Sequence, residues 1–395
     1  MTSGQCPLPR EVLMRLVGAI LADDLAQETK RSLPVGSILA WTAETTIDED
    51  GVGLDSLMRL SAAQRVADYF GLREVGYEDY LLIRRTLGEW AEIVELSWRV
   101  NHDTVTFRTS GSTGPAKVCE HRFVDLLEEV RQFSAIVGPR ARAVSFVAPH
   151  HIYGFLHAAL LPVEAGLVSV DLRATTPGSR LERLAGGDLV VATPYVWGLL
   201  ADEAGRFPDG IVGMTSTAPM SRELAERLAS KGLARLIEIY GSSETGGVGW
   251  RCGVDKPYTL LPAWRRSGRG IVRGKGAEQA LPDVVDWVGE RDLRPLRRED
   301  GAVQIAGVNV YPARVAEILR RHPVVADCLV RRASRGDDAR LEAFVVCKDA
   351  AADREATAGE VASFCARELT APERPVRIEV GAALPLDAMG KPTAW

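Results

Sequence analysis

A regular alternation of short apolar runs with helical patterns between residues 123 and 240 constrains the fold more than any other feature of this sequence. The apolar runs predict strands at residues 143–148, 167–172, 189–193, 211–215 and 236–240. Helical periodicity is clearest over residues 123–137 and 222–230. Strands separated by helices are joined by crossovers, so this zone predicts an α/β fold with a mainly parallel sheet.

Two further zones flank this one, and we expect three domains in all. Residues 1–99 show helical patterns and few strand runs, whereas residues 100–295 carry the α/β core. Residues 296–395 predict a small α+β domain with its own core. Its expected elements are a hairpin at 303–310, a helix at 313–321, strands at 325–331 and 341–347, and a helix at 359–369.

The helix predicted over residues 55–70 is the clearest element of the first zone. Gly71 closes it, and its apolar residues fall on one face. These residues are Leu57, Leu60, Ala63, Ala67 and Phe70.

Charge and composition exclude several classes of function. A formal net charge of −5 gives no electrostatic reason to expect nucleic-acid binding. No run approaches the roughly 20 apolar residues of a membrane span, so we expect no membrane partner and a cytoplasmic location. The six cysteines are scattered without metal-ligand spacing, which favours reduced thiols.

A loop rich in glycine and hydroxyl side chains follows a strand at residues 105–107. Glycines allow an anion to approach the backbone, hydroxyls donate to phosphate oxygens, and a lysine adds positive charge. The pattern differs from the Walker A loop. The loop consists of Thr109, Ser110, Gly111, Ser112, Thr113, Gly114, Pro115, Ala116 and Lys117.

Polar residues also follow two later strands of the predicted sheet, where ligand sites of open α/β sheets form. Tyr240 and Gly241 open a turn in which Tyr240 could stack on a purine and Glu244 could hold Mg²⁺. Upstream, residues 216–220 include Ala218 and Pro219 and could form the other wall of a nucleotide slot. Near the end of the chain, Lys391 follows a glycine and could reach into a cleft.

In order and spacing, these motifs resemble the acyl-adenylate-forming superfamily, which includes acyl-CoA synthetases, luciferases and adenylation domains of peptide synthetases. The resemblance runs from Thr104 to Lys391. It implies the adenylate-forming enzyme fold with a small, mobile C-terminal domain. Only about a hundred residues precede the phosphate loop, so we expect a trimmed N-terminal lobe.

The resemblance also implies roles for the matching residues. The ATP phosphates would be bound by Thr109, Ser110, Gly111, Ser112, Gly114 and Lys117, and Mg²⁺ would be held by Glu244 and Thr113. The nucleotide slot would be lined by Ala218, Pro219, Tyr240 and Gly241. The catalytic lysine would be Lys391, which with Glu244 and Thr113 makes up the proposed catalytic set. Asp283 would bind the ribose, with Asp286 as the alternative, and Arg298 would mark the interdomain hinge.

The acid pocket falls on the family's Pro-x-His-x-x-Gly element, here Pro149–Gly154, with His151, Tyr153 and Gly154 as lining residues. Peptide-synthetase domains for α-amino acids place an aspartate in this segment, and none is present here. We therefore expect an aryl or acyl carboxylic acid. The implied reaction forms an acyl-adenylate from ATP and the acid, then passes the acyl group to a thiol of coenzyme A or of an acyl carrier protein.

Residues 50–57 resemble the Asp-Ser-Leu signature of acyl carrier proteins, followed by Phe70–Leu72 and Thr86–Trp90 at carrier-like distances. This implies a carrier-like domain over residues 1–99, with 4′-phosphopantetheine on Ser56 as the acceptor thiol. The alternative is that Asp55 is an N-cap and Ser56 the first helical residue.

Three other interpretations stay open. The chain could be a free-standing aryl- or acyl-CoA ligase with a non-functional N-terminal domain, or an inactive carrier or scaffold protein. An unrelated P-loop hydrolase is disfavoured because no Walker A lysine is found. Retention of Lys391 and Glu244, which folding alone does not need, favours an enzyme.

Overall fold

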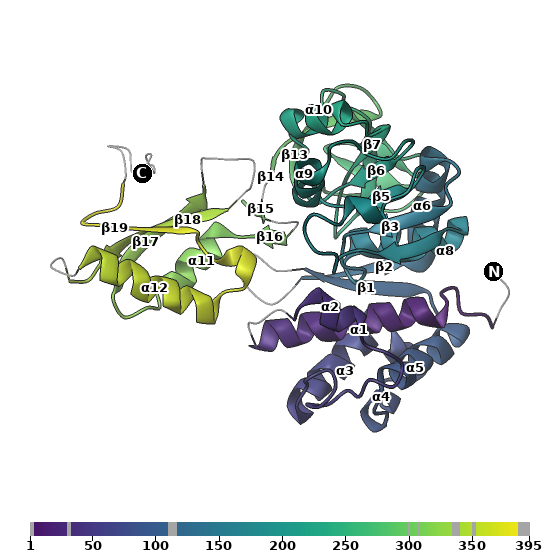
Figure 1. Ribbon diagram of the computed structural model, residues 1–395, viewed down its shortest axis with the longest axis horizontal. Helices are drawn as coiled ribbons and strands as arrows, with labels where there is room; N and C mark the ends of the chain where they lie inside the picture. The colour runs from purple at the N-terminus through teal and green to yellow at the C-terminus, as the bar shows by residue number, and fades with distance from the viewer. Residues whose placement is uncertain are drawn as a thin grey trace. The chain divides into compact units, whose positions relative to one another are not determined.

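The computed structural model describes residues 4–29, 33–109, 117–298, 301–305, 308–333, 340–349 and 353–385. The chain forms two compact units, which are coloured by residue number in Figure 1. The first unit runs to Leu296, and the second begins at Arg297.

A nine-stranded sheet forms the centre of the first unit. Its parallel half confirms the predicted strands and has the order β4 (Val168–Asp171), β3 (Arg142–Ser145), β5 (Leu189–Val191), β6 (Val212–Thr215) and β7 (Arg235–Ser242). The order continues with β8 (Gly246–Arg251), β9 (Tyr258–Leu260), β14 (Asp292–Arg298) and β13 (Asp283–Trp287). A smaller sheet contains β10 (Trp264–Ser267), β11 (Gly270–Arg273) and β12 (Glu278–Gln279).

Side-chain alternation along the parallel strands divides the interior into two cores. Leu189 and Val191 belong to one apolar cluster, and Val190 between them belongs to the other. Helices cover both faces, as a parallel sheet requires. They are α6 (Phe123–Val137) with α7 (Ile152–Gly154), a π-helical turn η2 (Phe155–Leu160) and α8 (Leu161–Ala165), and also α9 (Pro194–Glu203) and α10 (Arg222–Ser230).

The N-terminal helices, apart from the short and largely exposed α2, join the larger of these cores. They are α1 (Arg10–Thr29), α2 (Val35–Leu39), α3 (Ser56–Phe70), the 3₁₀ turn η1 (Leu72–Val75), α4 (Tyr80–Ile83) and α5 (Leu87–Val100), followed by the hairpin of β1 (Thr104–Thr109) and β2 (Lys117–Arg122). The Trp98 ring lies 5.3 Å from Phe70 on α3 and 5.5 Å from Phe123 on α6. The sequence predicted residues 1–99 as a separate domain; apolar residues of these helices instead belong to the same core as residues of the sheet, within one compact unit.

Helix α3 ends at the predicted Phe70 and begins one residue later than predicted, at Ser56, and only part of its apolar face is buried. Ala63, Ala67 and Phe70 are buried, whereas 76% of Leu57 and 51% of Leu60 are exposed. The shared apolar face predicted from the sequence is therefore covered only in part. The buried residues of α3 begin at Ala62, so the first turn lies outside the packed region.

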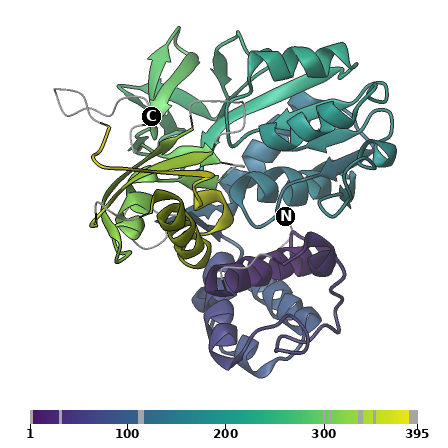
Figure 2. The ribbon, with the colours of Figure 1, turned by 60° about the vertical axis from the view of Figure 1, so that its left-hand side comes forward.

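The second unit has its own apolar core, which includes Leu319, Val345 and Cys365. The small α+β architecture predicted here is confirmed, and α12 lies along the three-stranded sheet of β17, β18 and β19 (Figure 2). The elements are β15 (Val303–Ile305), β16 (Val308–Val310), α11 (Pro312–Leu319), β17 (Val325–Arg332), β18 (Leu341–Cys347), α12 (Arg354–Glu368), the turn η4 (Ala371–Glu373) and β19 (Arg377–Gly381). Strand β19 was not predicted; it pairs in parallel with β18.

Candidate active site

Lys117 and Glu244 meet at one end of the sheet. Lys117 opens β2 and pairs across the hairpin with Thr109, the last residue of β1. Its Nζ lies 2.6 Å from Oε1 of Glu244, in the turn after β7. Burial is the largest single effect and would raise the pKa of the Glu244 carboxyl, but hydrogen bonds from Lys117, the backbone and Ser242, together with the charge of Lys117, outweigh it and lower that pKa. A cation and an ionised carboxylate 127 residues apart are thus brought together where ligands of α/β sheets bind.

Tyr240 and Asp283 form a second contact between distant predicted site residues. The Tyr240 hydroxyl donates to Oδ2 of Asp283 at 2.8 Å. Asp286 is exposed further along the same strand, so the two candidate aspartates occupy different surroundings. The Tyr240 ring is largely buried beside Tyr258, with 5.5 Å between ring centroids. Gly241 follows at a register shift of β7 against β8, where a side chain would collide with the carbonyl oxygen of Gly246.

The loop after β6 holds a strained residue. Thr217 has φ of 77°, the one positive φ of a non-glycine residue in the described ranges. Such a conformation in a β-branched residue costs on the order of 1–3 kcal/mol and occurs often at functional sites. Ala218 and Pro219 follow it, half-buried and exposed respectively. Ser216 anchors the loop to β7 through a 3.0 Å hydrogen bond from its Oγ to the carbonyl of Ile239.

The predicted acid-binding segment follows β3. His151 is exposed, whereas Tyr153 is buried and donates from its hydroxyl to the carbonyl of Ala192 at 3.3 Å. Any side chain at Gly154 would overlap the carbonyl oxygen of Ala148. The segment therefore turns tightly back on the end of its own strand, and glycine is required there.

Glu129 and His157 are buried behind these loops and were missed by sequence reasoning. Glu129 accepts a hydrogen bond from the amide of Gly247 at 2.9 Å, and complete burial raises its pKa to about 8. Burial lowers the pKa of His157 to about 3, and its ring lies 5.3 Å from that of Tyr153. Both side chains are thus neutral at pH 7. No motif marks them, because their environment arises from tertiary packing.

Several predicted residues lie outside the described ranges: Ser110, Gly111, Ser112, Thr113, Gly114 and Lys391. The described ends of their loop are Thr109 and Lys117, paired in the β1–β2 register. Arg298 closes β14 and belongs to the second unit, whereas the residues described above belong to the first.

Ser56 lies at the first position of α3 and is exposed. The Asp55 side chain caps this helix by accepting from the amides of Leu57 and Met58 at 2.9 and 2.8 Å. This is the N-cap arrangement that was the alternative to a carrier signature.

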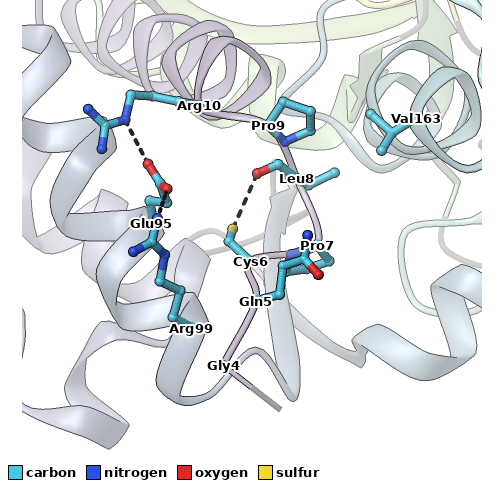
Figure 3. Close-up of a pocket in the computed structure, with 10 residues that line it drawn as sticks. All are labelled: Gly4, Gln5, Cys6, Pro7, Leu8, Pro9, Arg10, Glu95, Arg99 and Val163. Atoms are coloured by element: carbon cyan, nitrogen blue, oxygen red, sulfur yellow. Dashed lines mark hydrogen bonds and ion pairs between the residues drawn. The ribbon is translucent and has the colours of Figure 1, made fainter. Parts of the chain in front are cut away.

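A broad hollow lies away from these strand ends, between the N-terminal segment, α5 and α8 (Figure 3). Its charged groups pair with each other: Glu95 accepts from Arg10 at 2.6 Å and also from Arg99. Burial raises the pKa of the Cys6 thiol, which donates to the Leu8 carbonyl at 3.3 Å. The predicted site residues are not among its lining residues, and we assign it no chemistry.

The described ranges contain neither a cluster suited to a metal ion nor a helix suited to cross a membrane. The His, Cys, Asp and Glu side chains there form no group of three or more suited to hold a metal ion. None of the helices there combines the length with the apolar character that a membrane span requires.

Comparison with known proteins identifies the family. The AMP-binding enzyme family matches residues 89–313, and its C-terminal domain family matches residues 314–391. A 4-coumarate–CoA ligase of Cereibacter sphaeroides is 37% identical over 98% of this chain and 97% of its own length. Another from Rhodobacter capsulatus is 37% identical over 97% of this chain and its full length. One from Halorhodospira halophila is 33% identical over 97% of this chain and 99% of its own.

Solved structures agree on the fold. An o-succinylbenzoate CoA synthetase from Bacillus subtilis superimposes with a TM-score of 0.63 over 96% of this chain and 91% of its own, at 17% identity. An amide bond synthetase from Marinactinospora thermotolerans also gives 0.63, over 96% and 92%, at 16% identity. These matches confirm the adenylate-forming fold but leave the carrier-like segment without support. The chain therefore belongs to the AMP-binding enzyme family and is an AMP-forming acid–thiol ligase.

Proposed function

We propose that the chain activates an aryl-propenoic acid of the 4-coumarate type with ATP and transfers the acyl group to coenzyme A. The principal support is the near-complete match to three proteins named 4-coumarate–CoA ligase. The acid segment supports this, because the buried Glu129 behind it is uncharged at pH 7. An α-amino acid would require an ionised carboxylate for its ammonium group.

In the first step, an oxygen of the acid attacks the α-phosphorus of ATP, and pyrophosphate leaves. Positioning and charge neutralisation carry such a reaction. The Lys117–Glu244 ion pair is the observation that supports a phosphate site here. When ATP binds, the Lys117 ammonium would exchange the carboxylate for phosphate oxygens. Lys391 would neutralise charge at the reacting carboxylate, and Asp283, oriented by the Tyr240 hydroxyl, would accept from the ribose hydroxyls.

Magnesium fits the same end of the sheet. Mg²⁺ bound to nucleotides is held by one or two carboxylates together with phosphate oxygens and water. Glu244 is half-buried and ionised, so it would hold the ion, which would supply charge neutralisation at the phosphates. Thr113 is the second proposed ligand.

In the second step, a thiol sulfur attacks the acyl carbon, AMP leaves, and the thiol proton passes to solvent. We propose coenzyme A as the acceptor rather than a pantetheine on Ser56. The packing of α3 supports this choice. A carrier domain must move to bring its pantetheine arm to the active site, whereas α3 is packed into the core of the catalytic unit. Ser56 is exposed, so a modifying enzyme could reach it, and the carrier alternative can be tested by experiment.

Acid-dependent ATP–pyrophosphate exchange tests the first step, with 4-coumarate compared against fatty and amino acids. Glu244→Gln should lower exchange by about 10- to 100-fold and raise the Mg²⁺ requirement, because a charge next to the phosphates is lost. The Arg131–Glu164 pair also has a 2.6 Å contact on the surface, so Glu164→Gln is a matched control that should keep full activity. Normal Mg²⁺ dependence in Glu244→Gln would remove its metal role.

Lys391→Ala tests the catalytic lysine. It should abolish most exchange while leaving the melting temperature within a few degrees of wild type, because the proposed role of this lysine is in the reaction and not in folding. Exchange equal to wild type would contradict the assignment. Appearance of 4-coumaroyl-CoA, followed by absorbance, tests the complete reaction.

A further inference from the structure

Glu244 lies in a tight turn, residues 242–247, which joins β7 to β8. The turn is cross-linked by its own side chains. Ser242 and Thr245 exchange hydrogen bonds, the amide of each donating to the hydroxyl of the other at 3.2 and 3.3 Å. The Thr245 hydroxyl also donates to the carbonyl of Gly246 at 2.9 Å. Because these bonds close the turn on itself, the contacts that hold its two sides also set the position of Glu244.

One contact on this turn comes from His121 on strand β2. Its Nε2 lies 2.7 Å from the carbonyl oxygen of Ser243, the residue before Glu244. A carbonyl oxygen only accepts, so Nε2 carries the proton. Burial lowers the pKa of His121, although the bond to Ser243 opposes this, so the ring is neutral at pH 7. His121 shares a face of β2 with Lys117, since alternate residues of a strand point the same way. The strand that carries Lys117 thus also holds the turn of its ion-pair partner.

A second contact comes from Glu129 on helix α6. Its Oε1 accepts from the amide of Gly247, three residues after Glu244, at 2.9 Å. A side chain at Gly247 would collide with this oxygen, and one at Gly246 would collide with the other oxygen of the same carboxyl. Two consecutive glycines therefore make room for the carboxyl of Glu129 against the backbone of the turn.

The charges around Glu129 are already engaged. Arg273 of β11 opposes the effect of burial on the Glu129 pKa, but its guanidinium is bound to Glu128 and to the carbonyl of Asp125, at 2.6 and 2.7 Å. A negative charge on Glu129 would therefore lack a dedicated cation in the described part of the chain, and the turn would have to shift to admit water. The other titratable groups on elements that pack on α6 are the neutral His121 and His157, Glu164, which is paired with Arg131, and Arg235, which donates to carbonyls at the end of α6.

We propose that His121 and Glu129 are positioning residues, which hold the two sides of this turn so that the Glu244 carboxylate faces Mg²⁺ and the ATP phosphates. The inference rests on the proposed function, because it assumes the metal role of Glu244. In the free protein, Lys117 fixes the same carboxylate at 2.6 Å. When phosphate oxygens take Lys117 away, the carboxylate loses this restraint, and the two contacts on the turn keep it in place. Their contribution is therefore greatest once the nucleotide is bound.

His121→Phe tests the first contact. It keeps an aromatic ring beside Phe107 but removes the donor to Ser243. We expect the Kd for Mg·ATP, measured by calorimetry without acid, to rise about 3- to 10-fold, as for loss of one hydrogen bond. The KM for Mg·ATP in ATP–pyrophosphate exchange should rise with it, and the KM for the acid should not. His121→Gln, whose amide can still donate, should restore most of the affinity.

His102→Phe is the matched control. His102 also bonds a backbone carbonyl, that of Trp98, and its ring also contacts a phenylalanine, Phe123, but it lies before β1 and not at the turn. This variant should leave Mg·ATP binding and exchange unaltered. An equal loss of affinity in His102→Phe and His121→Phe would overturn the proposal, because a general effect of removing a buried imidazole would then explain both.

A double-mutant cycle decides whether His121 acts through Glu244. In Glu244→Gln the carboxylate is already lost, so the further change His121→Phe should weaken Mg·ATP binding little more. A full 3- to 10-fold loss in that background overturns the proposal, as does an unchanged Kd for Mg·ATP in His121→Phe alone. Failure of the proposed function would be seen differently, as a normal Mg²⁺ requirement in Glu244→Gln itself.

The pH profile of exchange tests the second contact. Glu129→Gln keeps an acceptor for the amide of Gly247 but cannot ionise. Because Glu129 is neutral below its pKa of about 8, exchange by the wild type should fall as the pH rises through about 8, and exchange by Glu129→Gln should not. Measured well below the melting temperature, this alkaline limb reports the folded enzyme and not its stability. Identical profiles above pH 7 in the two proteins would overturn the role of Glu129.

Discussion

The N-terminal helical segment and the second unit flank the α/β sheet in sequence, and each looks like a small domain there. In the structure only the second unit buries its apolar residues among themselves. The N-terminal segment inserts Trp98 between Phe70 of its own helix α3 and Phe123 of α6. Length and composition therefore do not decide whether a segment is independent. The deciding factor is which surface its largest apolar side chains cover.

Separating the segments should give the largest effect. We expect residues 297–395, expressed alone, to show a cooperative thermal transition, because their core is complete. Residues 1–103 should remain largely unfolded, because without the sheet residues such as Trp98 and Phe70 lose their partners. Circular dichroism and one-dimensional NMR measure both outcomes. A folded 1–103 fragment would show that the N-terminal segment is as independent as the second unit, and would support the carrier-like domain.

Core truncations sharpen the same contrast within the intact chain. Trp98→Ala should lower the free energy of unfolding of the first unit by about 3–5 kcal/mol. It should spare the calorimetric transition of the second unit. Leu319→Ala, at a fully buried site in the second unit, should do the opposite, by about 2–5 kcal/mol. Loss of both transitions in either variant would mean that the two units unfold together.

The pH dependence of stability should also differ between the units. Burial raises the pKa of Glu129 from 4.5 to about 8, so the folded first unit retains a proton that the unfolded chain releases. Its free energy of unfolding should therefore fall as the pH rises from about 4.5 to 8. Glu129→Gln mimics the protonated carboxyl and should flatten this slope, with the second transition as internal reference. Calorimetry at pH 5.5 and pH 8 measures this change. If the free energy of unfolding changed equally with pH in wild type and in Glu129→Gln, the carboxyl of Glu129 would not be neutral in the folded protein.

The smallest expected effect is at Ser56. If the N-terminal segment serves only as part of the catalytic unit, Ser56→Ala should leave coenzyme A thioester synthesis unchanged. A phosphopantetheinyl transferase with coenzyme A should likewise add no mass to the wild-type protein. Intact-protein mass spectrometry decides this. A pantetheine adduct on Ser56 that then carries the acyl group would establish the carrier alternative.

Prediction from sequence succeeded where local pattern and tertiary structure agree. The helices at 123–137 and 222–230 were predicted to the residue, because their apolar spacing reflects the face that the sheet covers. The motifs around Lys117 and Glu244 were recognised by their residue pattern, and the two side chains lie together in the structure, whereas their roles stay predictions. Local pattern failed for Leu57 and Leu60, whose apolar character does not reveal that the first turn of α3 is uncovered.

The groups that sequence reasoning missed are defined by tertiary contacts alone. Nothing near Glu129 distinguishes it from the exposed glutamate beside it, and only packing beneath Gly247 makes it neutral. Tyr69 and His150 likewise line one small hollow although they stand 81 positions apart, on elements that the sequence assigned to different domains. Neither site has a local signature.

The hydrogen bond from Tyr240 to Asp283 has a consequence for the curvature of the sheet. Strand β13 stands four places from β7 in the strand order, which would be about 19 Å in a flat sheet at roughly 4.8 Å per strand. A tyrosine side chain cannot span that gap, yet the two side chains meet at 2.8 Å. The strands between them must curl until the edge of the sheet returns towards its middle. A ribose held by Asp283 would then lie on the concave side of this curl, enclosed by strands that a flat sheet would keep out of reach.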